Sequence, residues 1–202
     1  MPIAAIQRPL SGENDILRGM FEARKRVFVD LLGWDLPVVS GMFELDQFDD
    51  ASAEYLVLTD DEGAHLASAR LLQTDRPHLL ADVFKHLCNS PVPQGPHVRE
   101  ITRFCLDPRS RAGERRDARN RLVTALVEHA LANGVAEYTG VASLGWFEQV
   151  ERFGWDCRAL GAPVCSGSGR LVALHIRIDE TTPERMKAAG IFNAARAVRT
   201  FA

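Results

Sequence analysis

The chain has 202 residues, a formal net charge of -3, 46% hydrophobic residues and 25% charged residues. This balance is typical of a globular protein and excludes a disordered chain, a collagen-like chain and a coiled-coil rod. The slightly acidic charge argues against a protein that binds nucleic acid by bulk charge. At roughly 150 residues per domain, the length predicts a single domain over residues 1–202.

The cysteines, the histidines and the start of the chain point to an intracellular protein. The four cysteines form no C-x-x-C pair, and their irregular gaps support neither a zinc ribbon nor a redox motif. The six histidines show no metal-ligand spacing. The chain does not open with a basic segment followed by an apolar run, and no apolar run is long enough to cross a membrane. We therefore expect a cytoplasmic protein with no bound metal and no membrane span.

Hydrophobic periodicity and turn residues divide the chain into helices and strands. The predicted helices cover residues 14–32, 79–86, 113–133, 146–153 and 181–196. The predicted strands cover residues 54–59, 65–72, 97–106, 137–143, 155–160 and 170–178. Residues 33–53 show no long periodicity and are predicted to form a loop. A loop of this length inside a compact domain is usually functional or mobile.

The order of these elements predicts the fold class. A helix comes first, then two antiparallel strands joined by a tight turn, and then strands that alternate with helices. This order favours an α/β fold, and we expect a three-layer α-β-α sandwich with a mixed central sheet. Acyltransferases of the GNAT type share this order. Fold order alone does not give the function.

The N-terminal half carries charged residues where apolar ones are expected. They comprise three arginines and three carboxylates: Arg24, Arg70, Arg103, Asp46, Asp49 and Glu100. Surface or buried ion pairs are the simplest interpretation of each residue alone, but buried pairs are a poor source of net stability. A polar ligand explains the whole set better, because arginines clamp a carboxylate bidentately and carboxylates hold an ammonium or sulfonium group. The set therefore suits a zwitterion with an additional positive charge.

Glu100 and Arg103 lie three residues apart in one predicted strand. Residues with this spacing point to opposite faces of a sheet unless a bulge intervenes. The apolar alternation slips in phase within this strand, which permits such a bend. We expect the two side chains to share a site only if the strand bends there.

Two aromatic residues accompany the charged set. Phe28 follows Arg24 by four residues, so the two share one helical face, and Trp34 follows the end of the predicted helix. Their flat faces could lie against a cation or an adenine ring. Ordinary core packing explains the two aromatic residues equally well.

In this order along the chain, the residues resemble the acyl-homoserine-lactone synthases, the LuxI-type autoinducer synthase family. The matching motifs are R-K-R-V-F, L-G-W, F-E-L-D-Q-F-D, A-R-L-L-Q-T-D-R-P-H-L-L and E-I-T-R-F, within residues 15–178. Three positions depart from the usual family pattern. Arg99 stands where the family often has Trp, Thr102 where it has Ser, and Ala67 where it often has Gly.

The resemblance implies an acyl transfer. The amine of S-adenosylmethionine attacks an acyl thioester carried by acyl carrier protein or coenzyme A. The methionine carboxylate then closes a lactone and expels methylthioadenosine, so the product is a quorum-sensing signal and no cofactor is needed. Because an α-amine has a pKa of about 7.7–8.0, it needs a base, and we expect Glu100 to act through a water molecule.

The resemblance also implies the remaining roles. Asp46 and Asp49 hold the ammonium group and organise the arginines, and at least one arginine orients the carboxylate. Backbone N–H groups beside a split in the central strands stabilise the oxyanion. The residues expected to bind S-adenosylmethionine are Arg24, Phe28, Trp34, Asp46 and Arg103, and those expected to act in catalysis are Glu100, Arg24, Asp46, Asp49, Arg70 and Arg103.

Two further sets complete the expected site. The acyl chain needs an apolar pocket, for which the candidates are Phe104, Leu122, Val141, Ala142 and Trp146. A basic stretch at the start of the long helix suits an acidic acyl carrier protein. Its candidate docking residues are Arg111, Arg115, Arg116 and Arg119.

Two alternatives remain open from the sequence. The first is a GNAT-type N-acetyltransferase that uses acetyl-CoA. Its phosphate-binding loop would precede the long helix, where Arg111 begins only a degenerate match to the motif. The second is a non-enzymatic relative that binds an acyl carrier or a small signal without turnover. Release of methylthioadenosine distinguishes the expected synthase from both.

Overall fold

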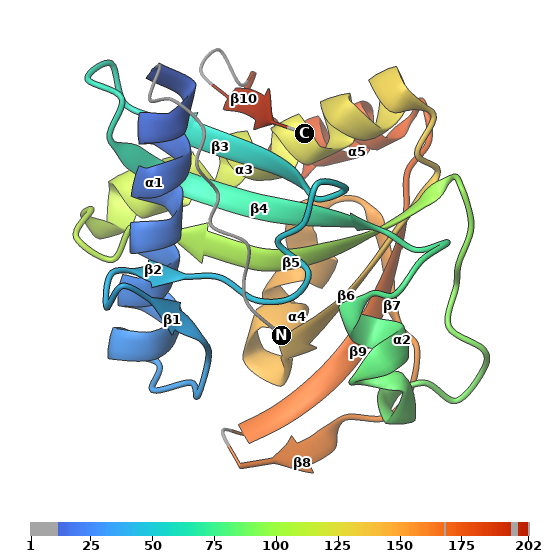
Figure 1. The fold of residues 1–202 in the computed structure, drawn as a ribbon. Coiled ribbons are helices and arrows are strands. Elements are labelled where there is room, and N and C mark those ends of the chain that lie inside the picture. The colour runs from blue at the N-terminus through green and yellow to red at the C-terminus, as the bar shows by residue number, and fades with distance from the viewer. Residues whose placement is uncertain (1–11, 168, 195–197, 202) are drawn as a thin grey trace.

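The computed structural model describes residues 12–167, 169–194 and 198–201, which fold around one large sheet (Figure 1). The sheet has eight strands in the order β10-β3-β4-β5-β6-β9-β7, and β8 also pairs with β9. Among the strands that the structure describes, only β5 and β6 pair in parallel, so the sheet is mixed as expected. The strands are β3 Glu54–Thr59, β4 His65–Gln73, β5 Val98–Leu106, β6 Glu137–Ser143, β7 Asp156–Ala159, β8 Val164–Ser166, β9 Gly169–Arg177 and β10 Val198–Phe201.

Helices cover both faces of this sheet (Figure 1). One face carries α1 (Gly12–Arg24) and the short α2 (Leu79–Asp82), and the other carries α3 (Ala112–Asn133), α4 (Leu144–Val150) and α5 (Thr182–Ala188). Single 3₁₀ turns follow α2 and α4, at Lys85–Leu87 and Glu151–Phe153. The predicted three-layer α-β-α sandwich is therefore confirmed.

The main core lies between the sheet and α3. Leu122 and Leu126, one helical turn apart, are fully buried, and α3 ends where Gly134 adopts a left-handed conformation with φ 67°. Strand side chains alternate between the two faces, so Leu56 packs toward α3 and Val57 packs toward α1. In the part of the chain that the structure describes, no helix is both long and apolar enough to span a membrane.

The structure differs from the sequence prediction at five places. The first helix continues beyond Arg24 as a π-helix over Lys25–Leu31, which we call the π segment. The predicted loop contains a small hairpin, β1 (Val38–Val39) with β2 (Phe43–Glu44). The C-terminal helix was predicted to reach residue 196 but ends at Ala188, because Gly190 takes a left-handed φ of 69°. Strand β10 then pairs with β3, and β8 was also not predicted.

Candidate active site

Six buried side chains form a closed ring of alternating charges, which we call the charge ring. Its residues come from α1, β2, the loop of residues 45–53 (the acidic loop), β4 and β5. Each arginine contacts two carboxylates, and each carboxylate contacts two arginines. Around the ring the ion pairs are Arg24–Glu44 at 2.6 Å, Glu44–Arg103 at 3.0 Å, Arg103–Asp46 at 2.7 Å, Asp46–Arg70 at 2.6 Å, Arg70–Asp49 at 2.8 Å and Asp49–Arg24 at 2.7 Å.

The carboxylates of the charge ring have their accepting positions filled. Asp49 accepts from Arg24 and also from the hydroxyl of Tyr55 and the amide of Asp46. Asp46 accepts four hydrogen bonds, from Arg70, Arg103 and the amide of Phe48. An ammonium group could reach either carboxylate directly only if an arginine moved away.

Burial and pairing oppose each other within the charge ring. Burial disfavours the charged form of Arg24, but its bonds to Asp49 and Glu44 outweigh this and raise its pKa. Burial likewise acts to raise the pKa of Asp49, yet the bonds and charges of Arg24 and Arg70 hold it well below its ordinary value. Arg24 and Asp49 therefore both stay charged at neutral pH. Replacing buried ion pairs by apolar residues is often neutral or stabilising, so stability alone does not explain such a ring.

Arg103 owes its place in the ring to a β-bulge. The register of β4 with β5 shifts between Ser68 and Arg70, and Arg103 takes a φ of 49°, which is rare for a residue other than glycine. The bulge keeps Glu100 and Arg103 on the α1 face, as the phase slip in the sequence permitted. Backbone strain of this kind gathers at functional sites.

The aromatic pair lies beside Arg103. The rings of Phe28 and Trp34 stack with centroids 5.0 Å apart and planes 21° apart. The Arg103 guanidinium lies 5.7 Å from the Phe28 centroid. Phe28 is buried, whereas Trp34 is 38% exposed. The pair thus joins the charge ring to the protein surface.

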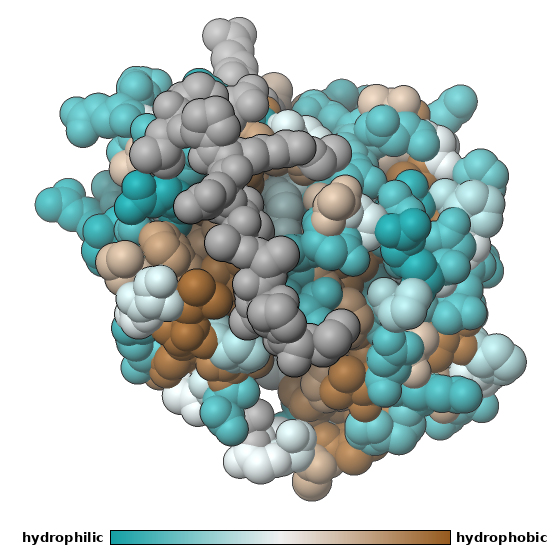
Figure 2. Space-filling model, in the orientation of Figure 1, coloured by the Kyte–Doolittle hydropathy of each residue, from teal (hydrophilic) through white to brown (hydrophobic). Residues whose placement is uncertain are grey.

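Apolar side chains gather on the surface beside this aromatic pair. Figure 2 shows them at the lower left, over the end of the π segment and the β1–β2 hairpin. The exposed residues are Leu31, Leu32, Trp34, Val38, Val39 and Met42. The rim of the candidate site is therefore apolar on this side.

Glu100 lies apart from the charge ring, beneath α2. Its Oε2 accepts from the amide of Leu80 at 3.1 Å, and its Oε1 is buried with no hydrogen-bond partner among the described residues. Burial raises the pKa of Glu100 to about 7, although the Leu80 amide and the charge of Arg70 act in the opposite direction. A carboxyl group that titrates near neutral pH is suited to general base chemistry.

The sheet splits next to Glu100. The parallel pairing of β5 with β6 ends at Ile101 and Gly140, although both strands continue beyond these residues. At the last pair the strands approach so closely that a Cβ on Gly140 would lie 2.9 Å from the Ile101 carbonyl oxygen. Thr139 is the register partner of Glu100, and its buried hydroxyl also has no hydrogen-bond partner among the described residues. The expected split is confirmed, and two unpaired polar atoms lie beside it.

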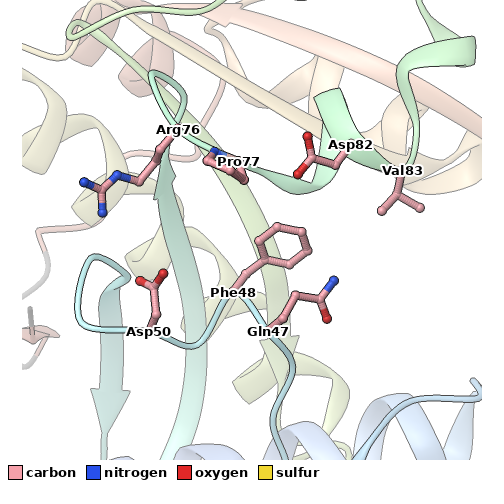
Figure 3. Close-up of a pocket in the computed structure, with 7 residues that line it drawn as sticks. All are labelled: Gln47, Phe48, Asp50, Arg76, Pro77, Asp82 and Val83. Atoms are coloured by element: carbon pink, nitrogen blue, oxygen red, sulfur yellow. The ribbon is translucent and has the colours of Figure 1, made fainter. Parts of the chain in front are cut away.

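An open pocket of about 470 Å³ lies between the acidic loop and α2. Figure 3 shows Phe48 projecting from the loop toward α2. The Arg70 guanidinium lies 5.9 Å from the Phe48 ring centroid, so this wall of the pocket is backed by the charge ring. The pocket is lined by Gln47, Phe48, Asp50, Arg76, Pro77, Asp82 and Val83.

The residues predicted for the acyl pocket do not share one face. Phe104 and Trp146 pack together at 5.1 Å and join Leu122 and Ala142 on the α3 face. Val141 lies on the opposite face, in the cluster that contains Leu80, Leu87 and Ala173. Val141 and Ala142 point to opposite faces because they are successive residues of one strand. The assignment of these residues to an acyl pocket stays a prediction.

The four candidate docking arginines differ in accessibility. Arg111 and Arg116 are exposed. Arg115 is half-buried and donates to the carbonyl groups of Pro108 and Ser110. Arg119 is also half-buried, with its guanidinium 5.0 Å from the Phe153 ring centroid, and burial lowers its pKa.

Glu44 is the member of the charge ring that the sequence prediction missed. It is completely buried and binds both Arg24 and Arg103. Its signal was present in the F-E-L-D-Q-F-D motif, where it stands two residues before Asp46. Asp50 of the same motif lies outside the ring and binds Ser52.

Known proteins are similar to this chain in sequence and in fold. A family model for autoinducer synthases matches residues 8–186. An acyl-homoserine-lactone synthase of Ralstonia nicotianae is 37% identical over 166 residues, which are 79% of this chain and 80% of the relative. The solved structure of TofI in a ternary complex with an inhibitor and MTA is 32% identical with a TM-score of 0.74, covering 90% of this chain and 92% of TofI. The solved structure of MesI, a CoA-dependent acyl-homoserine lactone synthase, is 26% identical with a TM-score of 0.79, covering 92% of this chain and 96% of MesI.

Fold and sequence together define an acyltransferase with a GNAT-like sandwich. The chain belongs to the autoinducer synthase family. The enzyme class that the sequence predicted, an acyl-homoserine-lactone synthase, is confirmed. The solved structure of a putative N-acetyltransferase from Lactobacillus plantarum shares the fold alone, at 19% identity.

Proposed function

We propose that this enzyme joins an acyl group from a thioester to the amine of S-adenosylmethionine and then releases an acyl-homoserine lactone and methylthioadenosine. The observation that carries the proposal is the charge ring, which is closed and buried except at Arg103 and Asp46, whose side chains are 7% and 6% exposed. This edge lies beside the aromatic pair. The reaction consumes only these two substrates and needs no further cofactor.

Arg103 is the residue that we assign to the methionine carboxylate. Its bonds to Glu44 and Asp46 use Nε and Nη2, and among the described residues Nη1 has no hydrogen-bond partner, so we assign Nη1 to the ligand. Arg24, in contrast, uses all three of its nitrogens within the ring. A guanidinium fixed by two carboxylates can orient the carboxylate for ring closure at little entropic cost.

Asp46 and Asp49 act in this proposal by holding arginines rather than by binding the ammonium group. Their accepting positions are filled in the structure, and an ion pair with Arg⁺ satisfies them already. Phe28 and Trp34 offer the faces against which the sulfonium or the adenine lies.

Glu100 is the proposed general base. Its unpaired Oε1 and its pKa of about 7 suit removal of a proton from the amine through one water molecule. The thioester lies at the split between β5 and β6, and backbone N–H groups beyond the last pair, Ile101 and Gly140, stabilise the tetrahedral oxyanion. The attack forms the amide and expels the thiol, and the carboxylate then displaces methylthioadenosine from the γ-carbon.

The proposal predicts methylthioadenosine as a product that depends on the acyl donor. The purified protein is incubated with S-adenosylmethionine and with matched acyl-CoA and acyl carrier protein thioesters of several chain lengths. Mass spectrometry should detect methylthioadenosine and a lactone in equal amounts with at least one donor. Thiol release from acetyl-CoA without methylthioadenosine would instead indicate the N-acetyltransferase alternative and would contradict the proposal.

The carrier itself is tested through the two exposed arginines. MesI takes its acyl group from CoA, whereas the basic start of α3 suits an acidic carrier protein. If the carrier docks there, reversing Arg111 and Arg116 to Glu should raise KM for the acyl carrier protein donor about five- to tenfold at low salt and leave kcat unchanged. The effect should shrink above about 0.1 M salt, where surface charges are screened.

A matched double reversal controls for net charge. Lys85 and Arg199 are exposed and lie on other elements, on the 3₁₀ turn after α2 and on β10. Reversing both to Glu changes the total charge equally and should leave KM unaltered. Equal effects of the two double variants would contradict docking at α3.

A further inference from the structure

The π segment has an unusual backbone. An α-helix bonds each amide to the carbonyl four residues before it. Here the amide of Leu32 bonds to the carbonyl of Val27 at 3.0 Å, and that of Trp34 bonds to the carbonyl of Phe28 at 2.8 Å. The five-residue spacing is that of a π turn. The six-residue bond closes the end of the helix after Gly33, which has a left-handed φ of 67° and whose own amide bonds to the carbonyl of Val29 at 3.1 Å. π-helical geometry is rare, occurs mostly as single turns and is frequent at functional sites.

An ion pair reports the same register. Lys25 and Asp30 are five residues apart and approach to 2.8 Å. On an α-helix the neighbouring side chains are three or four residues apart, so this pair fits the wider turn. Both side chains are partly exposed, at 27% and 47%. Because the pair is exposed, it contributes little to stability. Its five-residue spacing is evidence for the π-helical register.

The wide turn and the left-handed Gly33 that follows it together set where the aromatic pair lies. Phe28 begins the last turn of the π segment and Trp34 follows its end, so six residues separate two rings that stack at 5.0 Å. The bond from the Trp34 amide to the Phe28 carbonyl ties the two residues together. The same turn places Phe28 against Arg103 at 5.7 Å. We expect that an α-helical turn in its place would move Trp34 out of this stack.

We infer that the π segment is a positioning element for S-adenosylmethionine. Its extra residue brings Phe28 and Trp34 together as one aromatic wall beside the exposed edge of the charge ring. This inference rests on the proposed function, because it assumes that the cationic substrate lies against that wall.

Deleting Asp30 tests the inference. Asp30 is exposed, and its removal allows the remaining six residues to continue as an α-helix. We expect the Kd for S-adenosylmethionine, measured by calorimetry on the full chain, to rise at least about tenfold, as for the loss of a cation–π contact. The matched control, Asp30→Ala, removes the same side chain but keeps the chain length and should stay within about threefold of wild type.

A second variant keeps the test decisive if the deletion does not fold. Exchanging the two residues by Val29→Asp with Asp30→Val keeps length and composition, and it places the acid four residues after Lys25, where it favours the α-helical register. This variant should also weaken S-adenosylmethionine binding and change the tryptophan fluorescence response to added S-adenosylmethionine. Its far-UV circular dichroism spectrum should match that of wild type, which shows that the variant is folded.

The two possible failures are distinguishable. If the folded deletion or exchange variant binds S-adenosylmethionine as tightly as Asp30→Ala does, the inference is wrong and the proposed function stands. If the wild-type protein neither binds S-adenosylmethionine nor releases methylthioadenosine, the proposed function is wrong and the inference falls with it.

Discussion

Glu100→Gln is expected to lower turnover about 100-fold or more, the usual contribution of a positioned general base. The amide has nearly the shape of the carboxyl group and can still accept from the Leu80 amide, so the local structure is retained. What is lost is the ability to take a proton. Methylthioadenosine release under saturating substrates measures the effect, and KM for S-adenosylmethionine should change little.

The wild-type enzyme should show the titration of this group in its pH profile. Because burial raises the pKa of Glu100 to about 7, the base form grows as the pH rises through that value. About a tenth of the molecules carry it at pH 6 and about nine tenths at pH 8. The rate should rise accordingly, whereas the residual rate of Glu100→Gln should lack this step. A variant with wild-type turnover would remove Glu100 from the base role.

The same pKa has a consequence for stability. Between the ordinary value of 4.5 and about 7, the folded protein holds a proton on Glu100 that the unfolded chain has released. The free energy of unfolding therefore falls as the pH rises through this window, by about 2–3 kcal/mol for this group. Denaturant unfolding at pH 5 and pH 8 should show this fall in wild type relative to Glu100→Gln.

Glu44→Ala is expected to have the largest effect on stability. It leaves Arg24 and Arg103 short of a buried partner, and breaking a buried pair costs about 3–5 kcal/mol. For a domain of this size, the loss corresponds to a Tm lower by about 10 °C. Turnover should fall as well, because Arg103 loses the carboxylate that holds its Nε.

An exposed glutamate provides the control for this experiment. Glu62 lies in the turn between β3 and β4 and is exposed. Glu62→Ala should change the free energy of unfolding by no more than about 0.5 kcal/mol. Similar Tm values for Glu44→Ala and Glu62→Ala would contradict the prediction that the buried ion pairs of Glu44 stabilise the folded protein.

Much of the fold could be predicted because its signals are local. The bounds of β3 and β6 match those predicted, since each strand has a continuous apolar or alternating pattern bounded by turn residues. Gly134 likewise ends α3 where predicted. The charged site could be predicted because two residues break such a local pattern. Arg70 and Arg103 interrupt apolar strands, and a buried charge needs a partner.

The rest depends on contacts between distant segments. Glu44 stood among several acids in a predicted loop, where acids are ordinary, and only its burial between Arg24 and Arg103 distinguishes it. The π segment keeps apolar residues at helical spacing, so its hydrogen-bond pattern leaves no trace in the sequence. Strand β10 is four residues long and exists through its pairing with β3.

That last pairing carries a practical consequence. Val198 to Phe201 lie antiparallel to Leu58 to Tyr55, so the short C-terminal strand caps one border of the sheet. Cutting the chain before Val198 would uncover the backbone donors and acceptors of an apolar strand, a template for joining other molecules. We therefore expect a chain cut before Val198 to aggregate at concentrations where the full chain does not.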